Sequence, residues 1–453
     1  PCGMLGYGFP VESFEKGLLD GPDAIVVDAG STDAGPHKLG AGVSIVSRMA
    51  CKKDLSLMIE GSRKLDIPLI IGSAGGSGAS AHVNWTLEII EEILEEKNIN
   101  CKLSVIWADI DKELVKKANK NGEIKDMGKN IPKLTDEIID ETNGIVAQMG
   151  LEPILEALEN KADIIVCGRA YDPSPFAAVG VYYGMDEALS YHLGKILECG
   201  ALCAEPGTTK DSIMGVIYED SFDVYPTNEA RRCNPTSVAA HTFYEKDHPY
   251  LLKGPGSLLN LKNCDFSPVN DRRVKVKGST LVKDDEYFIK LEGARKKLYR
   301  TFVIAGIRDP LLIEKIDLVQ SEIVKDIQLY FKEIPKDSYE INFYNYGKNG
   351  VMGELEPDKS TPKEIGVLFE VLAKTQEEAS TICSAVRSSF LHYGYEGRKS
   401  TSGNLAFPFA PSDVEFGPVY EFSVYHLMKV EDGKSLFPIE YMEVKDGKIS
   451  RHS

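Results

Sequence analysis

The sequence is short of positive charge. Lysine and arginine number 52 against 69 aspartates and glutamates, so the formal net charge at pH 7 is −17. Binding to nucleic acid requires clustered basic side chains that displace counterions from phosphates, and docking on an anionic membrane requires a polybasic segment. The charge balance therefore argues against nucleic acids and membrane surfaces as partners.

Long apolar runs are also missing. The longest stretch without a charged residue is 67–87, and its middle is the glycine-rich GSAGGSGAS. A helix that crosses a bilayer needs about 20 consecutive, mainly apolar residues, so this stretch is not a membrane span. No secretory signal peptide is visible, and we expect a cytoplasmic protein.

Cysteine spacings typical of cross-links are absent. The nine cysteines include no CxxC pair, which argues against a disulfide framework and a structural zinc site. His192, Ile196, Cys199 and Cys203 have a spacing that places them on one face of a helix. We interpret them as core residues, because cysteine is among the most buried residue types; a metal or thiol site is the alternative. No HxxE or HExxH spacing occurs, and the sequence identifies no metal or other cofactor.

The N-terminal half alternates short apolar runs with amphipathic helical stretches such as 85–98. Strands separated by helices predict βαβ units with right-handed crossovers, and hence a largely parallel sheet of the α/β class. The four predicted strands lie in DAIVVDAG (23–30), LDIPLIIGSAGG (65–76), CKLSVIWADID (101–111) and KADIIVCGRA (161–170).

Beyond residue 205, alternating runs broken by glycine and proline are typical of antiparallel strands. We predict an α/β domain with glycine-rich ligand loops over 1–205 and a strand-rich continuation of it over 206–335. A smaller C-terminal α/β domain is predicted over 338–453, after a charged linker at 331–340. Its predicted elements are strands near 340–345, 365–373 and 418–430 and a helix over Thr375–Leu391, which a Thr375–Glu378 capping box begins.

All four predicted N-terminal strands end in small or polar residues. Ligands bind outside the carboxyl ends of parallel strands, so Asp28, Gly75, Asp109 and Arg169 should cluster at one edge of the sheet. The segment VVDAGSTDAGPHKLG (26–40) could orient an acid/base pair or bind an anion through backbone N–H groups. A solvated turn without chemistry is the alternative. The candidates here are Asp33 and His37 as catalytic residues and Ser31 and Thr32 as substrate-binding residues.

The glycine-rich segment 72–80 lies between a strand and a helix that should begin near Asn84. An anion can bind at such a helix N-terminus, where unpaired N–H groups meet the helix dipole. The segment is neither GxxxxGK[ST] nor a clean GxGxxG, so it does not specify a nucleotide. A flexible connector is the alternative. The candidate ligand contacts are Ser73, Gly75, Gly76 and Ser77.

Two further segments carry reactive side chains. In GRAYDPSPFAA (168–178), Arg169 presents a planar fork suited to a carboxylate, and Asp172 could hold that fork or act as a base. A structural ion pair is the alternative. In RRCNPTSVAAHTFYE (231–245), a thiol beside two arginines could become a nucleophile or an acid. The candidates in that segment are Arg232, Cys233 and His241.

An ordered series of motifs gives a family resemblance. The motifs are GSAGGSGA, GRxxDxxxF, LECGALCAEPG, RRCNPTSVAAHTFYEKDHPYLLxGPG, DRRVKVKG, KLEGA and YRTFVIAGIRDP. Together they resemble the acyclic terpene utilisation protein AtuA family from about Gly6 to Pro310, and more weakly beyond. The resemblance implies a catabolic cytosolic protein that acts on a branched acid or its acyl-CoA, with a small companion protein as a possible partner. The closely spaced cysteines and the intact SVAAHTFYE segment indicate a divergent branch.

Three functions fit these observations. The first is a lyase or hydratase for a small, anionic substrate, with Asp33 or His37 as acid or base, Arg169 or Arg308 as carboxylate anchor, and 72–78 as an oxyanion or phosphate cradle. The second is a kinase- or ligase-type enzyme that uses a nucleotide bound at DAGST and the glycine loop. The third is a non-catalytic subunit that binds an acyl-CoA or a companion chain.

Aromatic residues near the C-terminus predict self-association. One evident helix can cover only one face of the small C-terminal sheet, and the other face needs cover. Aromatic side chains are enriched at protein interfaces, so we expect a homo-oligomer; an intramolecular interface is the alternative. The residues concerned are Phe343, Tyr344, Tyr346, Tyr420, Phe422 and Tyr425.

Overall fold

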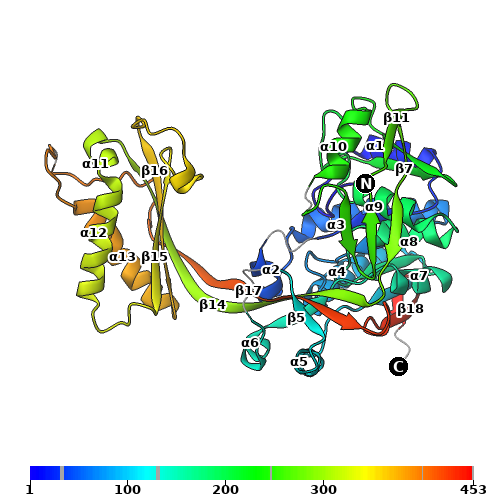
Figure 1. Cartoon of the computed structure of the whole chain (residues 1–453), viewed down its shortest axis with the longest axis horizontal. Helices are drawn as coiled ribbons and strands as arrows, with labels where there is room; N and C mark the ends of the chain where they lie inside the picture. The colour runs from blue at the N-terminus through cyan, green and yellow to red at the C-terminus, as the bar shows by residue number, and fades with distance from the viewer. Residues whose placement is uncertain (31–34, 129–132, 245–246, 400, 451–453) are drawn as a thin grey trace. The chain divides into compact units, whose positions relative to one another are not determined.

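The computed structural model describes residues 1–30, 35–128, 133–244, 247–399 and 401–450. It mixes helices with parallel and antiparallel sheets, which confirms the α/β class (Figure 1). The chain forms two compact units. The first comprises Pro1–Arg295 and Glu421–Ser453, and the second comprises Lys296–Tyr420.

The first unit is built on a six-stranded sheet that contains all four predicted N-terminal strands. The strand order is β1-β2-β6-β3-β18-β19. The first four strands are mutually parallel, whereas β18 runs antiparallel to β3. The strands are β1 (Ile25–Asp28), β2 (Leu69–Gly72), β3 (Cys101–Ile106), β6 (Ile164–Cys167), β18 (Ile439–Lys445) and β19 (Lys448–Ser450).

Helices cover both faces of this sheet. Leu69 and Ile71 of β2 pack in one core with α3 (Arg48–Leu65) and α4 (Ser80–Lys97). Ile70, between them, belongs to a second core that includes α7 (Glu152–Glu159) and α8 (Ser174–Tyr182). Both faces are buried because successive strand residues point to opposite sides, which explains why these strands read as continuous apolar runs.

The strand-rich segment after residue 205 forms two antiparallel sheets of the first unit, in the orders β11-β12-β8-β7 and β13-β10-β9. Their strands are β7 (Ile213–Ile217), β8 (Ser221–Pro226), β9 (Leu251–Gly254), β10 (Ser257–Asn260), β11 (Asp265–Pro268), β12 (Val274–Lys277) and β13 (Thr280–Lys283). The remaining elements are α1 (Val11–Leu19), α2 (Pro36–Ala41), α5 (Lys112–Lys120), β4 (Ile124–Asp126), α6 (Asp136–Glu141), β5 (Gly144–Ala147), α9 (Glu187–Leu197) and α10 (Pro235–Phe243).

The second unit packs helices on one face of an antiparallel sheet. Its helix α13 begins after Thr375. The Thr375 hydroxyl accepts a hydrogen bond from the Glu378 N–H and the Glu378 carboxylate accepts one from the Thr375 N–H, which confirms the predicted capping box. The strands are β14 (Tyr287–Ile307), β15 (Tyr339–Tyr346), β16 (Ile365–Ala373) and β17 (Val414–Val430). The helices are α11 (Pro310–Glu314), α12 (Ile316–Tyr330), the short 3₁₀ helix η2 (Gly353–Leu355) and α13 (Gln376–His392).

The boundaries between the units differ from the expected ones. The long strand β14 begins in the first unit, where it pairs with β5, and continues into the second, where it pairs with β16. The segment 331–340 joins α12 to β15 within one core and is not a linker between domains. Beyond Tyr420 the chain returns to the first unit, because the alternating apolar residues of β18 pair with β3.

Helix α9 is shorter than the sequence pattern suggested. The expected helical face from His192 to Cys203 is wrong, because α9 ends at Leu197. His192 and Cys203 are nevertheless fully buried, and Cys199 is half-buried. Among the described residues, no helix is long and apolar enough to cross a membrane.

Candidate acid–base site

The carboxyl ends of β1, β2 and β6 meet at one edge of the sheet, as the parallel topology predicts. A Cβ on Gly30, after β1, would lie 1.8 Å from the carbonyl oxygen of Gly76. A Cβ on Gly78 would lie 2.1 Å from the backbone nitrogen of Arg169, after β6. No side chain fits at either place, so glycine permits the three strand ends to touch.

The glycine-rich loop uses its own N–H groups for this packing. The N–H groups of Ala74, Gly76 and Gly78 donate to backbone carbonyls, and residues 72–78 are buried. The helix that follows begins at Ser80 rather than near Asn84. At its first turn the Asp109 carboxylate accepts hydrogen bonds from the Ser80 N–H, at 3.2 Å, and from the Ser80 hydroxyl, at 2.6 Å. The chain itself therefore supplies the anion that we expected from a ligand.

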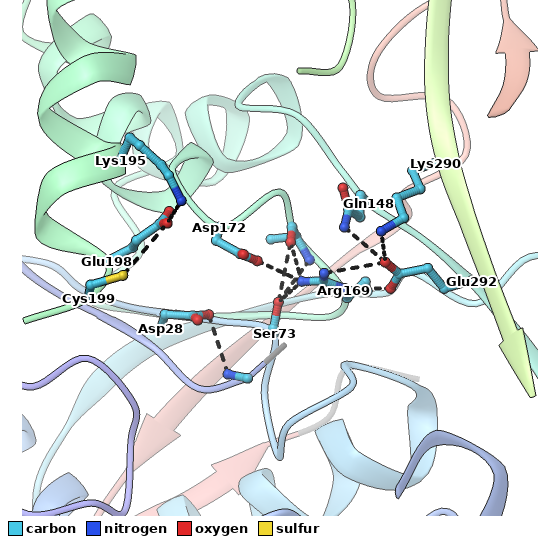
Figure 2. A network of polar contacts seen from close by, with 12 residues as sticks. Asp28, Ser73, Gln148, Arg169, Asp172, Lys195, Glu198, Cys199, Lys290 and Glu292 are labelled. Carbon is cyan, nitrogen blue, oxygen red and sulfur yellow. Dashed lines mark hydrogen bonds and ion pairs between the residues drawn. The ribbon is translucent and has the colours of Figure 1, made fainter. Parts of the chain in front are cut away.

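Arg169 is the centre of a buried polar network (Figure 2). Its side chain is only 2% exposed, and its Nε donates to Glu292 at 2.7 Å. Its Nη1 donates to Asp172 at 2.8 Å, to Ser73 Oγ at 3.0 Å and to the Ala170 carbonyl at 2.7 Å. The guanidinium fork is thus already occupied by groups of the protein.

Glu292, on β14, closes the far side of this network. Lys290 lies 2.8 Å from its Oε1, and the Gln148 amide donates to the same oxygen at 3.0 Å. Burial opposes ionisation here, but the charges of Arg169 and Lys290 outweigh it and lower the pKa of Glu292 to about 2. Glu292 is therefore a permanent buried anion.

Asp28, the last residue of β1, is a carboxyl group whose pKa is shifted in the opposite direction to that of Glu292. It is 6% exposed, and among the described residues its side chain accepts a long hydrogen bond, 3.4 Å, from the Gly30 N–H. Burial raises the pKa of Asp28 well above its usual range, and the nearby Asp172 and Glu198 raise it further, against the opposing charge of Arg169. Asp28 is therefore a carboxyl group whose ionisation its surroundings oppose, and it lies beside the Arg169–Asp172 ion pair.

A second ion pair borders Asp28 on the side of α9 (Figure 2). Lys195 Nζ lies 2.6 Å from Glu198, and both side chains are at most 10% exposed. The Cys199 sulfur lies 3.0 Å from the Tyr244 hydroxyl, and burial, reinforced by Glu198, raises the pKa of Cys199 to about 12. Cys199 is consequently a thiol at neutral pH.

Counting charges supports a proton on Asp28. Among the residues that the structure describes, the network contains four carboxyl groups and three cations: Asp28, Asp172, Glu198 and Glu292 against Arg169, Lys195 and Lys290. With Asp28 neutral, three anions face three cations. A buried network of balanced charge avoids the large cost of an uncompensated ion.

The comparison with known families is decisive for family membership. The family model of the acyclic terpene utilisation family protein AtuA matches residues 54–410 of the 453. The chain belongs to the AtuA family. No curated protein and no solved structure matches this chain. The matched range includes Arg169, Asp172, Glu198 and Glu292 and begins after Asp28.

Several residues expected to form the site of this AtuA family member do lie near the network. Arg169, Asp172 and Ser73 belong to it, and Gly75, Gly76 and Ser77 form the buried loop beside it. His241 stacks on Tyr244 with ring centroids 4.8 Å apart, and Tyr244 contacts Cys199. His37 lies in the first turn of α2, and Ser31, Thr32 and Asp33 fall outside the described residues.

Three expected substrate contacts have other partners in the described structure. Arg232 pairs with the exposed Glu205 at 3.2 Å, and Cys233 is buried with its sulfur 3.9 Å from Cys203 in a separate apolar core. Arg308 belongs to the second unit, where it donates to the Lys363 carbonyl. Each of these three side chains is in contact with another group of the protein, because the segment that carries it packs against that group.

Sequence reasoning missed five members of the network. Two of the motifs that carry the AtuA resemblance contain most of them. KLEGA carries Lys290 and Glu292, and LECGALC carries Glu198. A charged residue within an otherwise apolar, small-residue motif was the signal that could have found them. The five residues are Gln148, Lys195, Glu198, Lys290 and Glu292.

Among the described residues, no group of three or more His, Cys, Asp or Glu side chains is arranged to hold a metal ion. The described network can supply proton transfer, because it sets a carboxyl group whose pKa is raised beside one that is paired with a cation.

Proposed function

We propose that the chain is a lyase of the hydratase type, in which Asp28 is the general acid and Asp172 the general base. The raised pKa of the buried Asp28 beside the Arg169–Asp172 ion pair carries this proposal. Two neighbouring carboxyl groups whose environments separate their protonation states are a recurrent acid/base arrangement. Asp172 is 28% exposed, which leaves it accessible to a substrate.

In the dehydration direction Asp172 takes the proton from the carbon next to the substrate carbonyl. The C–H electron pair forms the new double bond as the C–O bond to the β-hydroxyl breaks. Asp28 donates its proton to the departing hydroxyl, and water leaves. The reaction ends with Asp172 protonated and Asp28 ionised, and transfer of one proton from Asp172 to Asp28 restores the starting state.

Arg169 has a positioning role in this proposal. Its fork holds Asp172 and Glu292, so a bound substrate would have to displace one of them to use it as an anchor. The carboxylate anchor that the sequence suggested is therefore not part of the proposal.

The charge balance favours an acyl thioester over a free carboxylate as the reacting group. Each of the three cations of the network already contacts a carboxylate. A further carboxylate beside Asp28 would add an unbalanced negative charge in a buried site. Membership of the AtuA family supports a role in terpene or acid catabolism, and a branched acyl group fits that role.

Solvent deuterium exchange tests the proposal across a panel of candidate substrates. The full chain is incubated in heavy water with coenzyme A thioesters of short branched 3-hydroxy acids and, separately, with the free acids. Mass spectrometry then measures deuterium at the α-carbon and loss of water. We expect exchange that falls about 10²–10⁴-fold in Asp172→Asn, the usual contribution of a general base.

The control is Asp66→Asn, which changes a carboxylate that is 95% exposed. It should leave exchange unchanged. Exchange that persists at the wild-type rate in Asp172→Asn would contradict the assignment of the base, and absence of exchange with every acid and thioester would contradict the hydratase function.

We also propose self-association through the second unit. Ile304, Leu368 and Tyr344 lie side by side on three adjacent strands, on the sheet face opposite the one that packs with α12 and α13. Ile304 is 38% and Tyr344 37% exposed. Phe343, also expected at an interface, instead packs in the core of this unit. A second copy or a small companion protein could cover this row.

We further propose a cytoplasmic location. All nine cysteines lie among the described residues and none is bridged in a disulfide, including Cys203 and Cys233, whose sulfurs are 3.9 Å apart. Thiols persist in reducing compartments, which supports the proposal.

A further inference from the structure

Glu292 is connected to the proposed acid–base pair through a single residue, Arg169. It is fully buried on β14, where its backbone pairs with Val146 of β5. One of its oxygens binds the Arg169 Nε at 2.7 Å, and the other binds Lys290 at 2.8 Å. The Gln148 amide at 3.0 Å fixes the carboxylate plane from a third side. The proposed chemistry uses Glu292, Lys290 and Gln148 only indirectly.

Arg169 transmits this arrangement because its guanidinium is planar and rigid. Glu292 binds the edge of the guanidinium that carries Nε and Nη2, and this fixes the orientation of the group. Nη1 then donates hydrogen bonds to Asp172 at 2.8 Å and to Ser73 at 3.0 Å. Fixing one edge of a planar fork fixes the other. The place of the Asp172 carboxylate is therefore set from a distant strand, since Glu292 lies 123 positions after Arg169 in the sequence.

Lys290 partly neutralises the negative charge of Glu292 that compensates Arg169. It shares Glu292 with Arg169 and also donates to the Tyr425 hydroxyl at 2.7 Å. Loss of the Glu292 charge leaves Arg169 with more positive charge to exert on the Asp28–Asp172 pair. Loss of the Lys290 charge leaves Glu292 to compensate Arg169 more completely. The two changes should act on the pair with opposite sign.

We propose that Glu292 is the positioning residue of the acid–base pair, acting through Arg169 and tuned by Lys290. This inference rests on the proposed function, since it takes Asp28 and Asp172 as the reacting groups. It goes beyond that function by assigning an electrostatic task to two residues whose described contacts are with Arg169, Gln148, Tyr425 and each other.

Titration of the Asp28 carboxyl group provides the test. Its carbon-13 signal in aspartate-labelled protein is assigned by its loss in Asp28→Asn. Among the described residues, the groups that face Asp28 are Asp172, Arg169, Glu198, Cys199 and Cys2, and Lys195 is paired with Glu198 at its border. None of these is changed by the variants Glu292→Gln and Lys290→Met. We expect the Asp28 titration to move to lower pH in Glu292→Gln and to higher pH in Lys290→Met.

A merely structural role would not produce shifts of opposite sign, because loosened packing affects both variants alike. Lys434→Met, which removes an ion pair with Glu156 on the surface, is the matched control and should not move the titration. Equal shifts, or none, would overturn the inference. If Glu292→Gln fails to fold, Lys290→Met alone decides, since Lys290 is 17% exposed and better tolerated.

The exchange assay separates this inference from the proposed function. Glu292→Gln should lower kcat about 10- to 100-fold with little change in KM, the usual cost of a misplaced catalytic group. Unchanged kcat in a folded Glu292→Gln protein would also overturn the inference. Wild-type protein without any exchange would count against the proposed function, while the Asp28 titration would still decide whether Glu292 and Lys290 act on the pair.

Discussion

Replacing Asp28 with asparagine should make the protein more stable and inactive. The folded state binds the Asp28 proton more tightly than the unfolded state, because burial and Asp172 raise the pKa of this group. Its contribution to the free energy of unfolding is complete below the unfolded pKa, near about 3.9. The contribution is lost as pH rises from the unfolded pKa through the folded pKa, because the unfolded chain releases this proton while the buried group still holds it. Asparagine cannot ionise, so the variant escapes this loss.

The magnitude follows from proton linkage. Between the unfolded and the folded pKa, one proton difference costs about 1.4 kcal/mol per pH unit. For a unit of this size, that corresponds to roughly 2–4 °C in Tm per pH unit. The neutral amide is nearly isosteric with the protonated carboxyl group, so Asp28→Asn should match wild type at about pH 4. It should gain in stability progressively as the pH is raised.

Thermal unfolding of both proteins from acid to mildly alkaline pH is the assay, with Asp66→Asn as control. The control changes an exposed carboxylate and should differ from wild type by a constant amount. Exchange activity of Asp28→Asn should fall about 10²–10⁴-fold, the contribution of a general acid. A variant whose Tm difference from wild type does not grow with pH would refute the claim that Asp28 is buried as the acid.

Three further predictions concern packing, charge and assembly. Gly78→Ala should prevent folding, measured as soluble yield and Tm, because its Cβ would meet the Arg169 backbone at 2.1 Å; Gly184→Ala, with positive φ but open space, should cost only about 1 kcal/mol. Arg169→Lys should lower the free energy of unfolding by about 1–3 kcal/mol in denaturant titrations, because one ammonium cannot satisfy Glu292, Asp172 and Ser73 together. Light scattering should give a mass at least twice the 49.9 kDa of one chain, and a value near 49.9 kDa would contradict self-association.

The sequence predicted the sheet of the first unit well, because both faces of its strands are buried. Apolar runs such as Leu69–Gly72 contain no polar residues that would interrupt the hydrophobic pattern, and each run is followed by a helix. The parallel topology then placed the strand ends together. The start of a helix after Thr375 was also predictable, because a capping box depends on two residues only three positions apart.

The unit boundary could not be predicted from local patterns. Strand β14 is 21 residues long and has a continuous β pattern, although it belongs to two units. The return of β18 to the first sheet depends on pairing with β3, more than 330 positions earlier, and nothing local marks that partner. Long-range pairing determines both features, whereas periodicity reports only on near neighbours.

The site itself was half predictable for the same reason. Arg169 and Asp172 are three residues apart, and their pairing followed from spacing. The partners that decide their roles, Glu292 and Glu198, come from distant segments. Without them Arg169 looked accessible to a ligand, and nothing local distinguished Asp28 from Asp33, the other carboxylate of its segment.

The glycine-rich loop shows how the same residues can be read in two ways. Glycine at a strand end permits close approach, either of a ligand to the backbone or of one backbone to another. Gly30, Gly76 and Gly78 bring the ends of β1, β2 and β6 into contact, and that contact places Asp28 beside Arg169. The closeness that buries Asp28 is also what raises its pKa. In this fold the glycines make the edge of the sheet dense enough to raise the pKa of a buried carboxyl group, so the packing of the loop and the raised pKa of Asp28 have one physical cause.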